Sequence, residues 1–139
     1  MKTKNTKGEK EIFEEAKKKY NRLMFDLCIE HVTIGTRFSE DTENWNLRDM
    51  VSECQYTLDC CYEEGNANQE GQYPDIWKYT ADDLMSKRRY DYVTRHNEEQ
   101  KEMHKSWLSK TRRLRNFITK YAPLIKGMKC AQGHCSCYD

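Results

Sequence analysis

The chain has 139 residues, a length that suits one domain. With 2 prolines, 6 glycines, 34% charged residues and a mean hydropathy of -1.08, the composition favours solvated helices over strands. No apolar run approaches the roughly 18 residues of a membrane span, and the basic start precedes no signal-like apolar segment. We therefore expect an all-α cytoplasmic protein whose 7 cysteines are reduced.

The first predicted helix runs from Glu9 to Ile34, after a basic lead-in of residues 1–8 that we expect to be disordered. Its apolar residues recur at spacings of three and four, which places them on one face. Gly35 is expected to end this helix, because glycine readily adopts the left-handed conformation that follows many helices. The residues of the apolar face are Ile12, Phe13, Ala16, Tyr20, Leu23, Met24, Leu27 and His31.

The second predicted helix begins after Asn46, which has the spacing of a capping box with Asp49. Gly65 is expected to end it. Residues 65–75 should then form the longest loop, because they are rich in glycine and asparagine and contain a proline. The apolar face of this helix consists of Leu47, Met50, Val51, Cys54, Leu58, Cys61 and Tyr62.

Thr80 and Asp83 repeat the capping signal, so a third helix should begin near Ala81. From there to Tyr121 the sequence contains neither proline nor glycine, which allows one long helix. Pro123 is expected to end it.

The apolar pattern weakens in the middle of this segment, and Asn97 followed by EEQ resembles a new helix start. We therefore predict one helix over residues 81–95 and another over residues 98–121. The predicted fold is a three- to four-helix antiparallel bundle that forms a single domain over residues 9–125. One long C-terminal helix in place of the last two is the alternative. Residues 126–139 form a short Cys- and His-rich tail.

Charge is separated along the chain, although the net charge is only +1. Residues 1–37 hold nine Lys or Arg against six Asp or Glu, residues 38–83 two against twelve, and residues 84–139 thirteen against five. The acidic second helix and the basic last helix could pair with each other, at about 0–1 kcal/mol for each exposed pair. Alternatively, each charged segment binds a charged partner.

The leading hypothesis rests on the acidic segment, in which only Arg48 offsets eight carboxylates. A rigid helix with spaced carboxylates can imitate nucleic-acid phosphates and fit a groove built for DNA or RNA. The sequence thus predicts a non-catalytic protein-binding module that occupies such a groove on a nucleic-acid enzyme. The predicted acidic surface consists of Glu40, Asp41, Glu43, Asp49, Glu53, Asp59, Glu63 and Glu64.

The last predicted helix supplies a first alternative, a nucleic-acid-binding protein. Its cations could hold phosphates while exposed rings stack on bases. However, Trp107, Phe117 and Tyr121 share the apolar stripe, so they are expected in the core, and a basic solvated face remains. That face consists of Lys105, Lys110, Arg112, Arg113, Arg115 and Lys120.

The final residues, KCAQGHCSCYD, supply a second alternative, a small zinc-stabilised helical domain. Zinc takes about four thiolate or imidazole ligands, which so short a stretch could provide only in a very tight loop. Two residues spaced three apart on the first predicted helix would share a face and could complete the site. A reduced tail without metal is the simpler interpretation. The candidate ligands are Cys130, His134, Cys135, Cys137, Cys28 and His31.

The sequence contains no Gly-rich phosphate loop, no His-Glu-x-x-His and no repeated Glu-x-x-His pair, so we expect no enzyme and no further cofactor. His96 and His104 are expected on a solvated helix face. In being short, helical, charge-sorted and without catalytic motifs, the chain resembles accessory proteins of phages and mobile elements, including anti-CRISPR proteins. This resemblance is one of general type, carried by no diagnostic motif, and it implies an inhibitor of a host enzyme.

Overall fold

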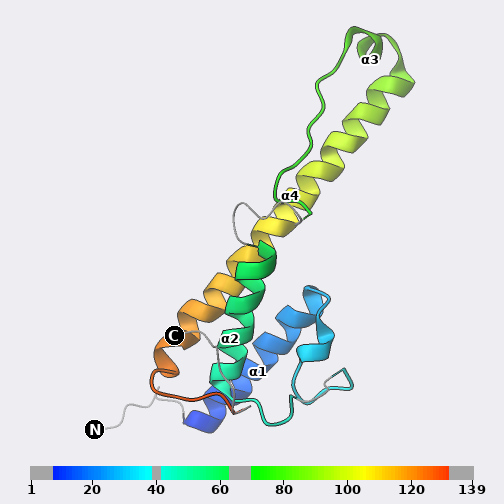
Figure 1. The fold of residues 1–139 in the computed structure, drawn as a ribbon. Coiled ribbons are helices and arrows are strands. Elements are labelled where there is room, and N and C mark those ends of the chain that lie inside the picture. Colours follow the sequence, from blue (N-terminus) through cyan, green and yellow to red (C-terminus); the bar gives the residue numbers. More distant parts are fainter. Residues whose placement is uncertain (1–7, 39–41, 63–69, 132–139) are drawn as a thin grey trace. The chain divides into compact units, whose positions relative to one another are not determined.

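The computed structural model describes residues 8–38, 42–62 and 70–131, which form helices and connecting segments without a strand. The fold is all-α with packing between helices, as the sequence predicts (Figure 1). No described helix combines the length and apolar character needed to cross a bilayer. The elements in chain order are α1 (Glu9–Asp26), a 3-10 turn (Glu30–Val32), α2 (Leu47–Thr57), a π-helical turn (Leu58–Tyr62), α3 (Ala81–Met85), α4 (Lys87–Tyr121) and a 3-10 turn (Ala122–Leu124).

Contacts within the chain divide it into two compact units. Unit 1 comprises Met1–Thr57 and Arg113–Asp139, and unit 2 comprises Leu58–Arg112. The chain therefore passes between the units after α2 and again within α4. The predicted limits of the lead-in and the tail stay predictions, since residues 1–7 and 132–139 lie outside the described part.

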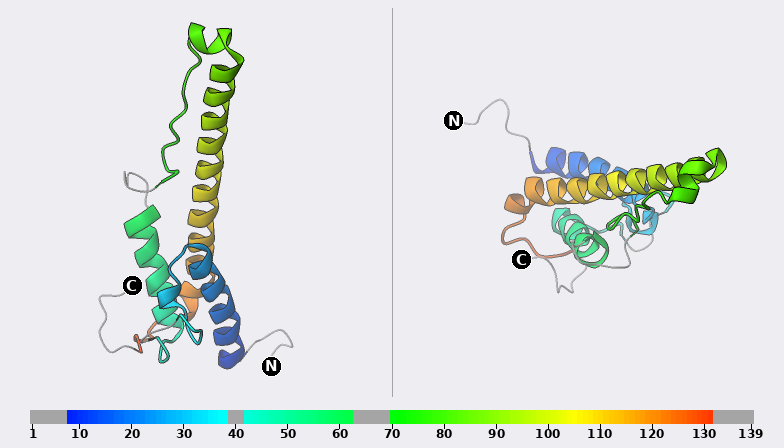
Figure 2. Two further views of the ribbon diagram at one scale, coloured as in Figure 1. Left: turned by 90° about the vertical axis from the view of Figure 1, so that its right-hand side faces the viewer. Right: turned by 90° about the horizontal axis from the view of Figure 1, so that it is seen from above.

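Unit 1 packs α1, α2 and the last turns of α4 around a shared core (Figure 2). Tyr20 of α1 is fully buried, and its ring centroid lies 6.0 Å from that of Phe117 and 6.2 Å from that of Trp45. Its hydroxyl donates a hydrogen bond of 2.9 Å to the carbonyl of Val32, so the buried polar group is satisfied. Other side chains of this core include Ala16, Leu23, Met24, Met50, Val51, Cys54, Leu114 and Ile125.

Helix α1 ends at Asp26, so the predicted helix end at Ile34 was wrong. Cys28 has a φ of 63°, its N–H donates to the carbonyl of Phe25, and the N–H of Ile29 donates to that of Met24. These two bonds form a Schellman motif around a left-handed residue. A cysteine in place of the usual glycine hides this stop from sequence patterns.

The connection after α1 is fastened to the helix by Asn21. Its amide nitrogen donates to the carbonyl of Ile34 at 2.7 Å, and its amide oxygen accepts the N–H of Ile34 at 2.8 Å. One side chain thus satisfies both backbone groups of a residue that has no regular secondary structure.

The predicted capping box at the start of α2 is confirmed. The N–H of Asn46 donates to Asp49 at 2.7 Å, and the N–H of Asp49 donates to Asn46 at 3.1 Å. The chain returns here after α4, because Asn46 also donates to the carbonyl of Lys129, and Asp49 accepts the N–H of Ala131. The start of the predicted tail therefore packs on α2.

The second predicted capping box is also confirmed, since Thr80 and Asp83 exchange both hydrogen bonds at the start of α3. The predicted break around residues 95–98 was wrong. The break falls at Ser86 instead, and α4 continues for 35 residues to Tyr121, two positions before Pro123. Asn97 does not cap a helix, because its side chain contacts another segment of unit 2.

Candidate interaction surface

Residues 74–80 of unit 2 have no regular secondary structure and run alongside α4 (Figures 1 and 2). A helix offers no free backbone groups to such a segment, so side chains of α4 must take their place. Asn97, which is 7% exposed, accepts the N–H of Trp77 at 2.8 Å and donates to its carbonyl at 3.0 Å. Unit 2 therefore repeats the two-bond clamp that Asn21 forms in unit 1.

Three further polar side chains of α4 fasten this segment. Gln100 accepts the N–H of Asp75 at 2.9 Å, and His96 bonds the carbonyl of Asp75 at 2.7 Å. His104 bonds the carbonyl of Gly71 at 2.8 Å. The predicted solvated positions of both histidines were therefore wrong, because each ring is partly buried and holds a backbone carbonyl.

Gly71, three residues before this segment, lets the chain lie close against α4. Its φ is +93°, and a β-carbon placed on it would lie 2.5 Å from the backbone oxygen of Met103 and 3.2 Å from the β-carbon of Trp107. A side chain at this position would both strain the backbone and collide with the helix. The glycine therefore sets the distance between the two.

The far end of the segment is fixed by Asp83. Its carboxylate accepts the N–H of Thr80 and forms an ion pair of 3.2 Å with Arg89. The hydrogen bond from the Thr80 backbone is the main cause that lowers the pKa of Asp83, and the Arg89 guanidinium adds to it. Asp83 therefore stays ionised as both cap and ion-pair partner.

Aromatic rings follow the segment in stacked pairs. The ring of Trp77 stacks on His96 with a centroid distance of 3.5 Å and an interplanar angle of 12°, and Tyr79 stacks on Tyr90 at 4.9 Å. Tyr92 lies 5.9 Å from Trp77. Stacking holds each ring in place while leaving part of it in contact with solvent.

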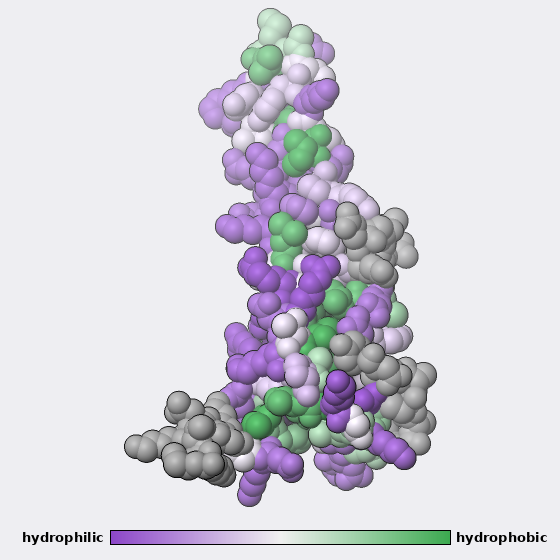
Figure 3. Space-filling model, turned by 90° about the vertical axis from the view of Figure 1, so that its left-hand side faces the viewer, coloured by the Kyte–Doolittle hydropathy of each residue, from purple (hydrophilic) through white to green (hydrophobic). Residues whose placement is uncertain are grey.

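The surface formed by residues 73–92 exposes eight large hydrophobic side chains, and we call it the aromatic surface. Figure 3 shows hydrophobic residues among hydrophilic ones around the α3 end of unit 2. Single exposed hydrophobics are ordinary, but so many within twenty residues mark a surface suited to a partner. The eight are Tyr73, Ile76, Trp77, Tyr79, Leu84, Met85, Tyr90 and Tyr92, with exposures from 36% to 86%.

A hollow of about 800 Å³ opens beside Trp77 and Tyr92 within this surface. Lys78, Arg88 and Arg95 line it, and none of the three forms an ion pair with a carboxylate of the described residues. The hollow therefore combines two aromatic rings with three cations that pair with no carboxylate of the described residues, beside the ion pair of Asp83 and Arg89.

The predicted acidic surface is only partly within the described residues, since Glu40, Asp41, Glu63 and Glu64 lie outside them. Asp49 is 2% exposed and serves as the cap of α2, so its carboxylate is buried instead of facing a partner.

Two of the other predicted carboxylates are exposed, and they belong to different units. Glu43 belongs to unit 1 and Asp59 to unit 2. Glu53 is half-buried, accepts a hydrogen bond from Thr57 at 3.3 Å, and has a pKa raised by burial.

The predicted basic face is divided between the units. Lys105, Lys110 and Arg112 belong to unit 2, and Arg115 is exposed on unit 1. The two remaining cations contact α1, as Arg113 pairs with Asp26 at 2.9 Å and Lys120 pairs with Glu15 at 3.0 Å. Trp107, Phe117 and Tyr121 are buried, as predicted.

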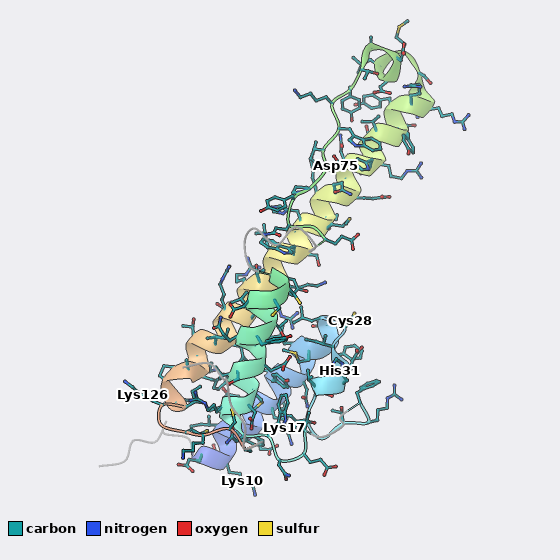
Figure 4. All side chains as sticks on the ribbon, viewed as in Figure 1. Lys10, Lys17, Cys28, His31, Asp75 and Lys126 are labelled. Carbon is teal, nitrogen blue, oxygen red and sulfur yellow. The ribbon has the colours of Figure 1, made fainter. Side chains whose placement is uncertain are left out.

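The candidate zinc ligands within the described residues form no three-ligand cluster. Because α1 ends at Asp26, Cys28 and His31 do not share a helix face and lie beyond the helix end, as Figure 4 shows. Cys130 is buried, and burial is the main cause that raises its pKa, with hydrogen bonding to Asp49 adding to it. No three potential ligands meet within residues 8–38, 42–62 and 70–131. His134, Cys135 and Cys137 lie outside the described residues, so the zinc hypothesis stays a prediction.

Sequence reasoning missed the aromatic surface. The sequence predicts a loop over residues 65–75 and no regular element for the hydrophobic residues that follow it. A signal was present, because Tyr73, Ile76, Trp77 and Tyr79 place four large hydrophobic residues within seven positions that belong to no predicted helix.

Comparison with known proteins finds no family model, no curated protein and no solved structure that matches this chain.

Proposed function

We propose that this protein is a non-catalytic module that binds another protein through the aromatic surface of unit 2. The observation that carries the proposal is the exposure of eight large hydrophobic side chains within residues 73–92. Trp, Tyr and Arg are the residues that most often dominate protein–protein binding energy, and all three occur here.

The fastening of the segment supports this function. Association costs less free energy when the contact surface is already ordered, because fewer side-chain and backbone rotations are lost. Asn97, Gln100 and His104 hold the backbone in place, and ring stacking holds Trp77 and Tyr79.

A protein partner fits this surface better than a nucleic acid does. Bases stack on aromatic rings, but they gain little from aliphatic side chains. Leu84 and Met85 are among the most exposed residues of the surface, at 63% and 86%, and Ile76 is exposed as well. Lys78 and Arg88, which pair with no carboxylate of the described residues, further favour a partner segment that carries carboxylates.

The narrower hypothesis, an anti-CRISPR-like inhibitor whose acidic surface occupies a groove of a nucleic-acid enzyme, stays a prediction. It is tested by Glu43→Lys and Asp59→Lys, which alter exposed carboxylates and leave the capping Asp49 intact. Unchanged binding by both variants would contradict it.

The proposed function is tested by quantitative affinity capture from the native host with Leu84→Ser/Met85→Ser. A matched control is Leu108→Ser/Leu124→Ser, which alters leucines of 44% and 48% exposure outside the aromatic surface. We expect one protein to be retained by the wild type and the control but lost from the first variant. If both variants retain the same proteins as the wild type, the aromatic surface is not the binding site. Arg88→Glu/Arg95→Glu should weaken the same interaction.

A further inference from the structure

A second charged site lies in unit 1, in a groove of about 440 Å³ between α1 and the end of α4. Five cations line it, three from α1 and two from α4. Its apolar lining includes Leu23, Phe117 and Tyr121, which are buried. The five cations are Lys18, Lys19, Arg22, Arg113 and Lys120.

Two carboxylates hold four of these cations in place. Asp26 pairs with Arg22 at 3.4 Å and with Arg113 at 2.9 Å. Glu15 pairs with Lys19 at 3.7 Å and with Lys120 at 3.0 Å.

The five cations of the groove and the two carboxylates that pair with them carry an excess of three positive charges. Glu11 and Glu14 line a neighbouring hollow beside Lys18 and Lys19 and do not line this groove. The ammonium groups of Lys19 and Lys120 both contact Glu15, so like charges lie close together and repel each other. Glu15 is also engaged by the hydroxyl of Tyr121 at 2.6 Å, so it is shared among three donors. An anion in the groove would relieve this repulsion.

The arrangement suits a chain of phosphates. On α1 the outermost lining cations, Lys18 and Arg22, are four residues apart, and on α4 Arg113 and Lys120 are seven apart. These separations correspond to about 6 Å and about 10.5 Å along the helix axes at roughly 1.5 Å per residue. One strand of DNA carries a phosphate about every 3.4 Å along the helix axis, so the longer separation spans about three phosphates. The rings of Phe117 and Tyr121 are 6% and 1% exposed, which leaves no ring free to stack on a base.

We infer that the groove between α1 and α4 of unit 1 binds the phosphate backbone of a nucleic acid without preference for sequence. This site is separate from the aromatic surface, and neither proposal depends on the other. It also differs from the basic face predicted for the last helix, because three of its cations come from α1.

The test is a fluorescence anisotropy titration with a labelled 20-nucleotide single strand and a 20-base-pair duplex, at 50 and 200 mM salt. For three neutralised phosphates, this change in salt should weaken duplex binding about 40-fold and single-strand binding about 20-fold. The stronger of the two arms identifies the form of nucleic acid.

Lys18→Glu/Lys19→Glu should raise Kd at least about tenfold at 50 mM salt and reduce the salt dependence. The matched control, Lys87→Glu/Lys101→Glu, makes the same charge change at exposed lysines of unit 2 that belong neither to the groove nor to the predicted basic face, and it should alter Kd less than about threefold. Circular dichroism checks that both variants stay helical, and Lys18→Gln/Lys19→Gln replaces the first should it unfold.

Three results would overturn the inference. The first is absence of binding at 50 mM salt. The second is an equal loss of affinity in the control, which would indicate net charge alone. The third is equally tight displacement of the oligonucleotide by polyglutamate, which would assign the groove to acidic proteins.

Discussion

Replacing Asn97 by alanine removes both hydrogen bonds that its side chain makes with the backbone of Trp77. At about 0.5–1.5 kcal/mol for each bond, the loss is roughly 1–3 kcal/mol. Alanine recovers up to about 0.7 kcal/mol because it favours the helix more than asparagine does. The expected net destabilisation is therefore about 0.3–2.3 kcal/mol. It should be concentrated in the segment of residues 74–80, which Asn97 holds against α4.

Amide hydrogen exchange measures this effect where it arises, at the N–H of Trp77. We expect exchange there to accelerate about 2- to 50-fold, which is the stated free energy expressed as a ratio. Asn116→Ala is the matched control, because Asn116 is exposed on the same helix and should show only the gain in helix propensity. Unchanged protection of Trp77 in the Asn97 variant would refute the clamp.

Three further predictions concern stability. Gly71→Ala should lower the free energy of unfolding, measured in urea, by more than about 2 kcal/mol. Gly127 has a similar positive φ but open space around it, so Gly127→Ala should lower that free energy by only about 1 kcal/mol. Equal losses in the two variants would contradict the close approach of Gly71 to α4. Burial is the main cause that raises the pKa of Tyr121 above its unfolded value of 10.0, so the stability from its protonated hydroxyl is full below pH 10 and is lost as pH rises further. Tyr121→Phe should flatten this decline in thermal melts, and an unchanged profile would count against it. Burial also raises the pKa of Glu53, so stability from its neutral form is present below about pH 4.5 and lost as pH rises through the folded pKa. Glu53→Gln should therefore be at least as stable as the wild type at pH 7, with the difference shrinking toward pH 4, and a less stable variant would disprove this.

The two proposed sites use different chemistry. The aromatic surface offers rings, aliphatic side chains and arginines to a folded or extended protein segment. The groove of unit 1 offers cations held by Asp26 and Glu15, above rings that are already buried. Variants at one site should therefore leave binding at the other unchanged, which the same purified proteins can show.

Local signals in the sequence determined the starts of α2 and α3 and the end of α4. Asn46 with Asp49, and Thr80 with Asp83, lie three residues apart, and such pairs meet whenever a helix begins between them. Pro123 prevents α4 from continuing as an α-helix, because its ring fixes φ and it has no backbone N–H to donate. The spacing of apolar residues likewise predicted most of the buried residues of α1, α2 and the last turns of α4, because that spacing depends only on the helical repeat. Two members of the predicted apolar faces, His31 and Cys61, are exposed, and both lie beyond the ends of α1 and α2.

Only the tertiary structure decided what those helices contact. Asn97 looked like a helix start, and its true partner, Trp77, lies 20 residues away. The groove joins lysines of α1 to Lys120 through Glu15, and Glu15 bonds Tyr121 across 106 residues. No short-range pattern encodes such meetings, because they depend on how whole helices pack and on which side chains the packing leaves uncovered. The sequence by itself therefore determined the elements, whereas both candidate binding sites arise from contacts between residues distant in the chain.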